Sequence, residues 1–188
     1  MARLIYLLNV SLDGYVEAAD HGLDWSTVDE ELHGWFNEQM RSLDAMLYGR
    51  RMYELMSAYW PTAESDPALS AVEREFAEIW RALPKIVFSG QLDRVEWNSR
   101  LMSGDVSERL ADLRREFDGD LAVAGPTLAR AFIERGRVDE YRLVVHPVVL
   151  GAGTPYFPPL DTRQQLRLLE TQTFGSGVTY LRYTIAGA

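Results

Sequence analysis

The chain has 188 residues, of which 47% are hydrophobic and 25% charged, so we expect one folded domain over residues 1–188 with a substantial core. Its formal net charge is −9 and no run of basic residues exceeds two, which argues against a nucleic-acid partner. It has no cysteine and only three scattered histidines, which excludes disulfides and thiol catalysis, and we expect no bound metal.

The first third of the chain predicts two buried strands and a helix. Leu4 to Val10 indicates a strand, ended by the turn at residues 11–14. Its apolar patch is too short for a signal peptide or a membrane span, as is every later one, so we expect a cytoplasmic protein without membrane contact. Thr27 and Glu30 have capping-box spacing for a helix, and Ala45 to Tyr48 indicates the second strand.

Helix and strand patterns continue to alternate up to about residue 145. Further helices are expected to follow Gly49, to open at Asp66-Pro67, to be capped by Asp105 and to begin at Thr127. Further strands are expected at residues 85–88, 95–97, 121–124 and 140–145, with an antiparallel pair at 167–173 and 178–185. This order predicts an α/β fold whose mixed sheet is mostly parallel and closes with that antiparallel pair.

Three of the strand ends carry turns suited to an anion. Gly125-Pro126 places a helix N-terminus at the end of a strand, where backbone N–H groups and the helix dipole favour negative charge. Arg50 and Arg51 follow Gly49, and Ser89 follows the next strand. Because parallel strands share a carboxyl edge, these turns together predict a site for one long phosphate-bearing ligand. Taken singly, each turn also fits a plain corner, and the arginines also fit a solvated pair.

Several common catalytic motifs are missing from the sequence. It contains no G-x-G-x-x-G dinucleotide fingerprint, no GxxxxGK[ST] phosphate loop and no G-x-S-x-G nucleophile elbow. Hydride transfer stays open, because a cofactor carries that chemistry and the protein mainly positions it.

Four blocks of sequence carry a family resemblance over nearly the whole chain. They are Asn9 to Tyr15, Tyr48 to Glu54, Lys85 to Ser89, and the segment from Val123 to Gly153. Together they resemble the dihydrofolate-reductase-like family, close to the C-terminal reductase domain of bifunctional riboflavin biosynthesis deaminase-reductase proteins. The resemblance implies a three-layer α/β/α domain, NADPH as the hydride donor, and a homodimer.

The same resemblance implies roles for individual residues. Gly49, Arg50 and Arg51 would meet the 2′-phosphate and pyrophosphate, with Ser89 nearby. Val10, Asp13 and Gly14 would border the nicotinamide and the substrate. Gly151 and Gly153 would shape the pocket wall or a dimer contact. The pyrophosphate and nicotinamide side would be held by Gly125, Pro126, Thr127 and Leu128.

Departures from the family pattern leave the substrate open. Met52 stands where a threonine often follows the Gly-Arg block, and Ala124-Gly125 replaces the usual Gly-Gly. We expect an NADPH-dependent oxidoreductase, similar to dihydrofolate reductase or 5-amino-6-(5-phosphoribosylamino)uracil reductase, that reduces a small pterin-, pyrimidine- or imine-like substrate. Asp13, water or the substrate would deliver the proton. The alternative is a non-catalytic nucleotide- or flavin-binding protein on the same fold.

Overall fold

Ten strands and five α-helices build the protein, whose computed structural model describes residues 2–186. No helix in this range is long and apolar enough to cross a membrane. The helices are α1 (Glu30–Arg41), α2 (Arg50–Tyr59), α3 (Ala71–Ala82), α4 (Val106–Glu116) and α5 (Pro126–Ile133), with a short 3₁₀ turn at Ala63–Ser65. The strands are β1 (Leu4–Ser11), β2 (Tyr15–Ala18), β3 (Leu43–Gly49), β4 (Lys85–Phe88), β5 (Ser99–Met102), β6 (Asp120–Ala124), β7 (Glu140–His146), β8 (Gly153–Pro155), β9 (Leu166–Thr173) and β10 (Thr179–Ile185).

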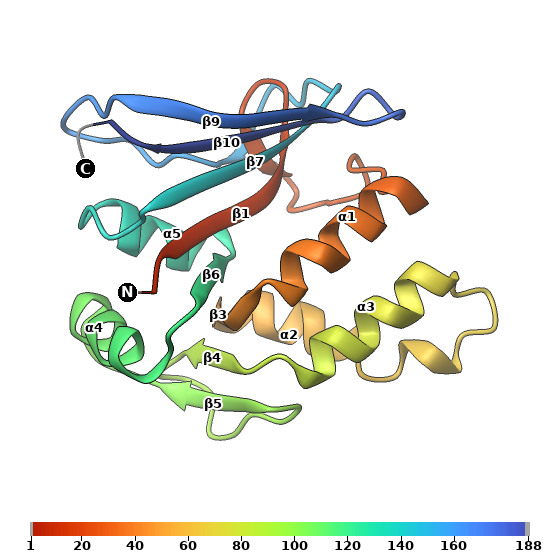
Figure 1. Ribbon diagram of the computed structural model, residues 1–188, viewed down its shortest axis with the longest axis horizontal. Helices are drawn as coiled ribbons and strands as arrows, with labels where there is room; N and C mark the ends of the chain where they lie inside the picture. The colour runs from red at the N-terminus through yellow and green to blue at the C-terminus, as the bar shows by residue number, and fades with distance from the viewer. Residues whose placement is uncertain (1, 187–188) are drawn as a thin grey trace.

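Eight of these strands form one sheet in the order β5-β4-β3-β6-β1-β7-β10-β9 (Figure 1). Neighbouring strands from β5 to β7 are all parallel. β10 runs antiparallel to both β7 and β9. The predicted mixed, mostly parallel sheet with an antiparallel C-terminal pair is therefore confirmed. β2 and β8 form a separate antiparallel pair beside it.

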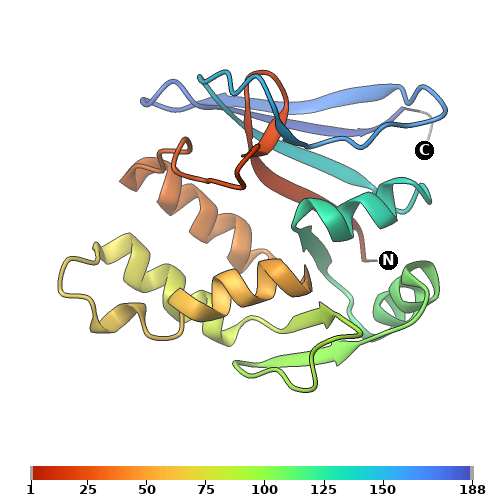
Figure 2. The same cartoon turned by 180° about the vertical axis from the view of Figure 1, so that it is seen from behind.

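Helices cover both faces of the sheet, which gives three layers (Figures 1 and 2). In β6, Leu121 and Val123 pack in the cluster to which α4 and α5 contribute, whereas Ala122 and Ala124 pack in the cluster to which α1 and α3 contribute. Successive side chains of a strand point to opposite faces, so a strand covered on both faces is apolar throughout. This explains the uninterrupted apolar runs in the sequence.

Two predicted helix starts were wrong. The N-cap of α1 is Asp29, whose side chain accepts a hydrogen bond from the Leu32 N–H, so the capping box expected at Thr27 does not form. The start of α3 is not at Asp66-Pro67 but at Ala71, after Ser70. Ser70 and Glu73 form a reciprocal capping box there, which satisfies two N–H groups at once and fixes the start.

The edge strand expected at Val95 to Trp97 was also misplaced. The strand that pairs with β4 is β5, which begins at Ser99. Trp97 and Asn98 have φ angles of 61° and 51°, in the left-handed region, so the chain turns at these residues and extends only afterwards.

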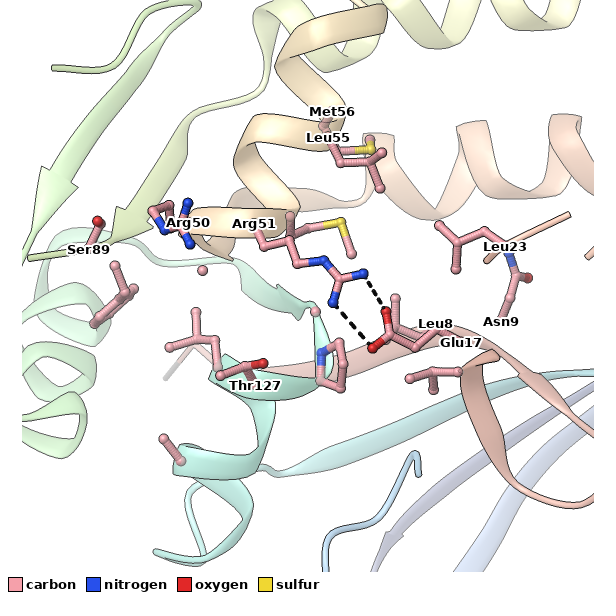
Figure 3. A pocket seen from close by; sticks show the side chains of 18 of the residues that line it. Leu8, Asn9, Glu17, Leu23, Arg50, Arg51, Leu55, Met56, Ser89 and Thr127 are labelled. Carbon is pink, nitrogen blue, oxygen red and sulfur yellow. Dashed lines mark hydrogen bonds and ion pairs between the residues drawn. The ribbon is translucent and has the colours of Figure 1, made fainter. Parts of the chain in front are cut away.

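The carboxyl edge of the sheet carries the start of α2, the start of α5 and the turn after β4. These three segments surround a cavity, into which side chains of Arg50, Ser89 and Thr127 project (Figure 3). β3, β4 and β6 are parallel neighbours, which is why their following turns meet.

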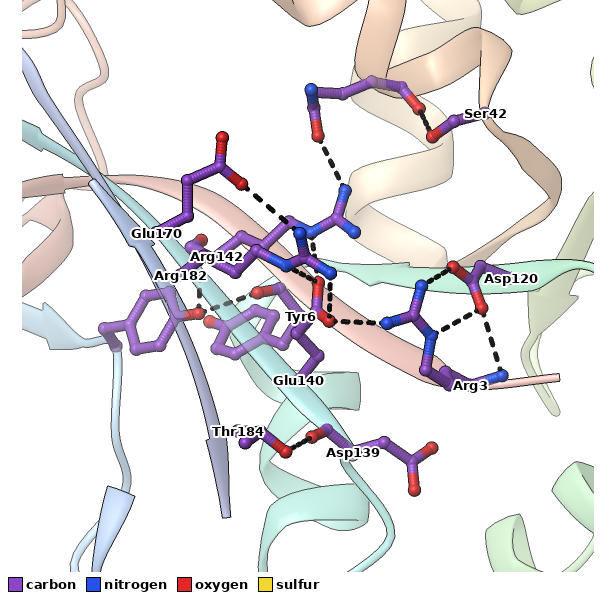
Figure 4. Close-up of polar contacts among 12 residues, drawn as sticks. Arg3, Tyr6, Ser42, Asp120, Asp139, Glu140, Arg142, Glu170, Arg182 and Thr184 are labelled. Atoms are coloured by element: carbon purple, nitrogen blue, oxygen red, sulfur yellow. Dashed lines mark hydrogen bonds and ion pairs between the residues drawn. The ribbon is translucent and has the colours of Figure 1, made fainter. Parts of the chain in front are cut away.

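The opposite edge of the sheet is held by a buried carboxylate (Figure 4). Glu140, at the start of β7, accepts hydrogen bonds from Arg3 Nη1 at 2.9 Å, Arg142 Nε at 2.6 Å and Arg182 Nη2 at 3.0 Å. The Glu140 side chain is only 2% exposed. These bonds join the residue before β1 to β7 and β10, so they hold together the ends of the strands that lie far from the site.

Candidate functional site

A cavity of about 700 Å³ lies at the carboxyl edge of the sheet (Figure 3). Its size is typical of a pocket for a cofactor or a small molecule. Eight of the predicted site residues line it together: Gly49, Arg50, Arg51, Ser89, Gly125, Pro126, Thr127 and Leu128. The prediction that the turns at Gly49, Ser89 and Gly125 converge is confirmed.

The two helices that start at this cavity differ from the other three in their caps. α2 and α5 have glycine N-caps, Gly49 and Gly125, with no hydrogen bond from a capping side chain. By contrast, the side chains of Asp29, Ser70 and Asp105 cap α1, α3 and α4. The first N–H groups of a helix have no partner within the helix. At α2 and α5 these groups and the positive helix ends are therefore directed at whatever occupies the cavity.

Gly125 adopts a backbone conformation that other residues rarely reach. Its φ is 97°, and a Cβ atom there would lie 3.2 Å from Cβ of Met52. This conformation turns the chain sharply from β6 into α5, and Pro126 occupies the first helical position, where its missing N–H costs nothing. Glycine is thus required where α5 begins beside α2.

Ser89 presents a hydroxyl donor to the cavity, near Arg50 at the start of α2 (Figure 3). Its Oγ accepts hydrogen bonds from the N–H groups of Gln91 and Leu92, both at 3.1 Å. Because the oxygen already accepts twice, the O–H is left to donate, and an anion is a suitable acceptor.

The two arginines of α2 have different partners. Arg50 is held by Glu54 one turn later, with Nη1 3.0 Å from Oε2, and both side chains are nearly half exposed. Such an exposed pair contributes only about 0.3–0.5 kcal/mol, so Arg50 can exchange Glu54 for a phosphate. Arg51 reaches across the cavity instead, with Nη2 2.9 Å from Oε2 of Glu17 on β2.

Glu17 is a site residue that the sequence did not reveal. Its side chain is 9% exposed, and it accepts hydrogen bonds from Thr154 Oγ1 at 2.6 Å and His21 Nδ1 at 2.8 Å besides its pairing with Arg51. Burial alone would raise the pKa of Glu17, but these hydrogen bonds and the charge of Arg51 outweigh it and hold the pKa below its usual value.

Gly153 explains how Glu17 reaches this position. It lies on β8, opposite β2, and a Cβ atom there would lie 2.0 Å from the Glu17 carbonyl oxygen. Only glycine therefore allows β8 to pair closely with β2 and to place Thr154 against the carboxylate. Gly151 and Gly153, predicted to shape the pocket wall or a dimer contact, are not among the residues that line the cavity, and that role stays a prediction.

Val10, Asp13 and Gly14, which were predicted to border the nicotinamide and the substrate, lie outside the cavity lining. Val10 is buried in the core with 1% exposure, and Gly14 forms the turn before β2, where its carbonyl accepts the Tyr156 N–H. The Asp13 carboxylate accepts from Ser11 Oγ at 2.6 Å and from the Gly151 N–H at 2.7 Å. The Ser11 hydrogen bond is the main cause that lowers the pKa of Asp13, so this carboxylate is ionised near neutral pH and ties the turn to the segment after β7.

The family follows from a comparison of the sequence with known families. The RibD C-terminal domain matches residues 2–180, which is nearly the whole chain. The chain belongs to the RibD C-terminal domain family. One relative of the chain is the uncharacterized protein YyaP of Bacillus subtilis (strain 168), which is 33% identical over 182 residues, 96% of this chain and 94% of YyaP.

Solved structures show the same fold. A diaminohydroxyphosphoribosylaminopyrimidine deaminase/5-amino-6-(5-phosphoribosylamino)uracil reductase from Thermotoga maritima superposes with a TM-score of 0.69 and 13% identity, over 98% of this chain and 57% of the larger protein. Dihydrofolate reductase from Enterococcus faecalis, complexed with NADP(H), gives 0.63 and 13%, over 98% of this chain and 96% of that one. The fold of the chain is therefore dihydrofolate-reductase-like, as predicted.

The end of the cavity away from Ser89 is mostly apolar. Leu23 and Leu55 line it, and Asn9 contributes a polar side chain there (Figure 3). Asn9 Oδ1 lies 3.0 Å from Nε2 of buried His146, whose pKa is lowered by burial. A neutral His146 donates to Asn9, which leaves the amide N–H groups of Asn9 for a ligand. One end of the site thus suits an anion and the other a flat apolar group.

Proposed function

We propose that the protein is an NADPH-dependent reductase of a small planar compound with a C=N or C=C–N bond, of the pterin, pyrimidine or imine kind. One observation carries this proposal: two helix N-termini without side-chain caps meet at a cavity that also holds Arg50 and Ser89. A ligand with several phosphate charges matches this set of donors better than any uncharged ligand does. Family membership supports a reductase of the dihydrofolate-reductase-like kind.

The residues present fit NADPH. The N-terminus of α5, at Gly125 to Leu128, would hold the pyrophosphate, and Arg50 with Ser89 would hold the 2′-phosphate. Each charge-assisted hydrogen bond of this kind contributes about 1.5–3 kcal/mol. When bound, NADPH supplies a hydride from C4 of its nicotinamide ring.

The protein's own residues would orient the reactants. Leu23 and Leu55 would pack against the substrate ring, and Asn9 would donate a hydrogen bond to a ring nitrogen or carbonyl. The substrate carbon gains the hydride, and we assign the proton added to nitrogen to water. Glu17 is ion-paired with Arg51 and Asp13 lies outside the lining, so neither is a ready proton donor.

The experiment is a titration with NADPH, followed by a survey of substrates. We expect saturable binding, seen as a change in nicotinamide fluorescence, and loss of the nicotinamide absorbance band when 7,8-dihydropterin or cyclic imines are added. Absence of any NADPH complex would refute the proposal.

A second candidate is a binding protein that holds a nucleotide or flavin without turnover. The observation that favours it is the lack of a protonated acid: Glu17 is the one carboxylate among the residues that line the cavity, and its pKa is lowered by its partners. Saturable NADPH binding without oxidation across a broad panel of substrates would support this candidate.

The homodimer and the cytoplasmic location implied by the family resemblance remain predictions. Light scattering on the purified protein tests the first, and fractionation of cells tests the second.

A further inference from the structure

The ion pair between Arg51 and Glu17 divides the cavity into two unlike ends. Figure 3 shows this pair in the middle, with Arg50, Ser89 and Thr127 on one side of it. Side chains of Leu23, Leu55 and Met56 lie on the other side, together with Asn9. The two ends therefore select for different chemistry.

Both basic residues that line the cavity stand at the start of α2. Of the lining residues, only Arg50 and Arg51 are basic. Arg50 lies at the polar end, and Arg51 is already neutralised by Glu17, whose side chain is 9% exposed. Once the polar end holds the phosphates of a nucleotide, the apolar end has no cation to offer to a second phosphate.

The chain beside the apolar end adds negative charge. Residues 19–29, which carry Leu23, contain no lysine or arginine but include Asp20, Asp24 and Asp29. The one basic side chain there is His21, and it is bound to Glu17. Together with the net charge of −9, these acidic residues give the protein an electrostatic field that repels anions and attracts cations.

We infer that the substrate is a flat, apolar ring compound that carries no phosphate and is neutral or cationic. This inference rests on the proposed function and goes further, because the reductase from Thermotoga maritima is named for a phosphoribosyl compound, whereas this cavity excludes one from its substrate end. Leu23 and Leu55 determine this specificity by packing on the ring, and a protonated cyclic imine suits the acidic surroundings.

The test uses protein saturated with NADP⁺, so that no turnover occurs, and three probes. Two form a matched pair: 5-amino-6-(5-phosphoribosylamino)uracil and the same compound after removal of its phosphate. The third is 3,4-dihydroisoquinoline, an apolar cyclic imine. Calorimetry is expected to show that the dephosphorylated compound binds at least about tenfold more tightly than the phosphorylated one, since no charge-assisted bond compensates for desolvation of the phosphate. Binding of 3,4-dihydroisoquinoline also supports the inference.

A cation placed at the apolar end should remove most of the preference. Leu55 is 50% exposed, so L55R is expected to fold. The new guanidinium group should strengthen binding of the phosphorylated compound by about tenfold relative to the dephosphorylated one. L168R is the matched control, because Leu168 is 48% exposed on β9 and does not line the cavity. It should leave all three affinities unchanged.

The outcomes separate this inference from the proposed function. Equal or tighter binding of the phosphorylated compound by the wild type, or binding of none of the three probes to protein that holds NADP⁺, overturns the inference and leaves the cofactor assignment intact. Failure to bind NADP⁺ and NADPH at all overturns both.

Discussion

Replacement of Arg50 by alanine tests the phosphate end of the site most directly. The Arg50 side chain is 46% exposed and its one partner is Glu54, so its loss leaves no buried charge unpaired. We expect Arg50→Ala to fold with nearly unchanged stability. Any change in cofactor affinity then reports on contacts with the cofactor and not on damage to the fold.

The magnitude follows from the two partners that compete for Arg50. A charge-assisted bond to the 2′-phosphate contributes about 1.5–3 kcal/mol. Release of the exposed pair with Glu54 costs about 0.5 kcal/mol. The net loss in Arg50→Ala is therefore about 1–2.5 kcal/mol, which weakens NADPH binding by about 5- to 60-fold. NADH lacks the 2′-phosphate, so its affinity should change by less than about twofold.

The assay is a fluorescence titration with NADPH and with NADH at low and at high salt. The difference between wild type and Arg50→Ala should shrink at high salt, because exposed charges are screened. Glu54→Gln removes the competing carboxylate and should tighten NADPH binding by up to about twofold. Arg115→Ala is the control, since Arg115 is 72% exposed on α4 and outside the cavity lining, and it should change neither affinity.

Equal losses for NADPH and NADH in Arg50→Ala would refute the assignment of the 2′-phosphate to this residue. Unchanged NADPH affinity would refute the placement of any cofactor phosphate near the start of α2.

Three further predictions concern the fold that supports the site. Glu140→Gln should lower the free energy of unfolding, measured in urea, by about 3–5 kcal/mol, because buried Arg142 loses its charged partner. Although burial raises the pKa of Glu140, hydrogen bonds and charges from the arginines around it hold the pKa below its usual value. The stabilising effect of Glu140 is thus present above its unfolded pKa of about 4.3 and is lost as the pH falls through its folded pKa. Wild type and Glu140→Gln should therefore converge in their free energy of unfolding in acid. A difference in unfolding free energy that stays constant with pH would contradict this. Gly125→Ala should lower the free energy of unfolding by about 1–3 kcal/mol and weaken NADPH binding, because φ is 97° there and Met52 lies 3.2 Å from the new Cβ atom. Gly136 is the control, since its φ is 61° and nothing lies near a Cβ atom there. Gly136→Ala should lower the free energy of unfolding but leave NADPH affinity unchanged.

The elements that the sequence predicted well are those whose signals are local. Lys85 to Phe88 is a short apolar run between a proline and a serine, and the structure has β4 at these residues. Asp105 caps α4 as expected, because an N-cap acts on N–H groups only two or three residues away. The helix starts failed where two capping signals lay close together, as with Thr27 and Asp29, since packing chooses between them.

The anion end of the candidate site was predictable for a related reason. Gly49, Ser89 and Gly125 each follow a recognisable strand, and the parallel arrangement of those strands brings their ends to one edge. The apolar end was harder to foresee. Its residues come from β1, from the segment after β2 and from α2, and no short motif contains them.

By itself, the sequence determined the alternation of helices and strands, the mostly parallel sheet and the turns that suit an anion, because each depends on residues close together in the chain. Only the tertiary structure decided that Arg51 pairs with Glu17 on β2 while Arg50 pairs with Glu54 on its own helix, and that Asp13 lies outside the cavity. These facts depend on how β2, β8 and α2 pack, and contacts between segments far apart in the chain have no local signal. The charge that is available to a ligand is therefore set by long-range packing, although the residues that carry it can be read in the chain.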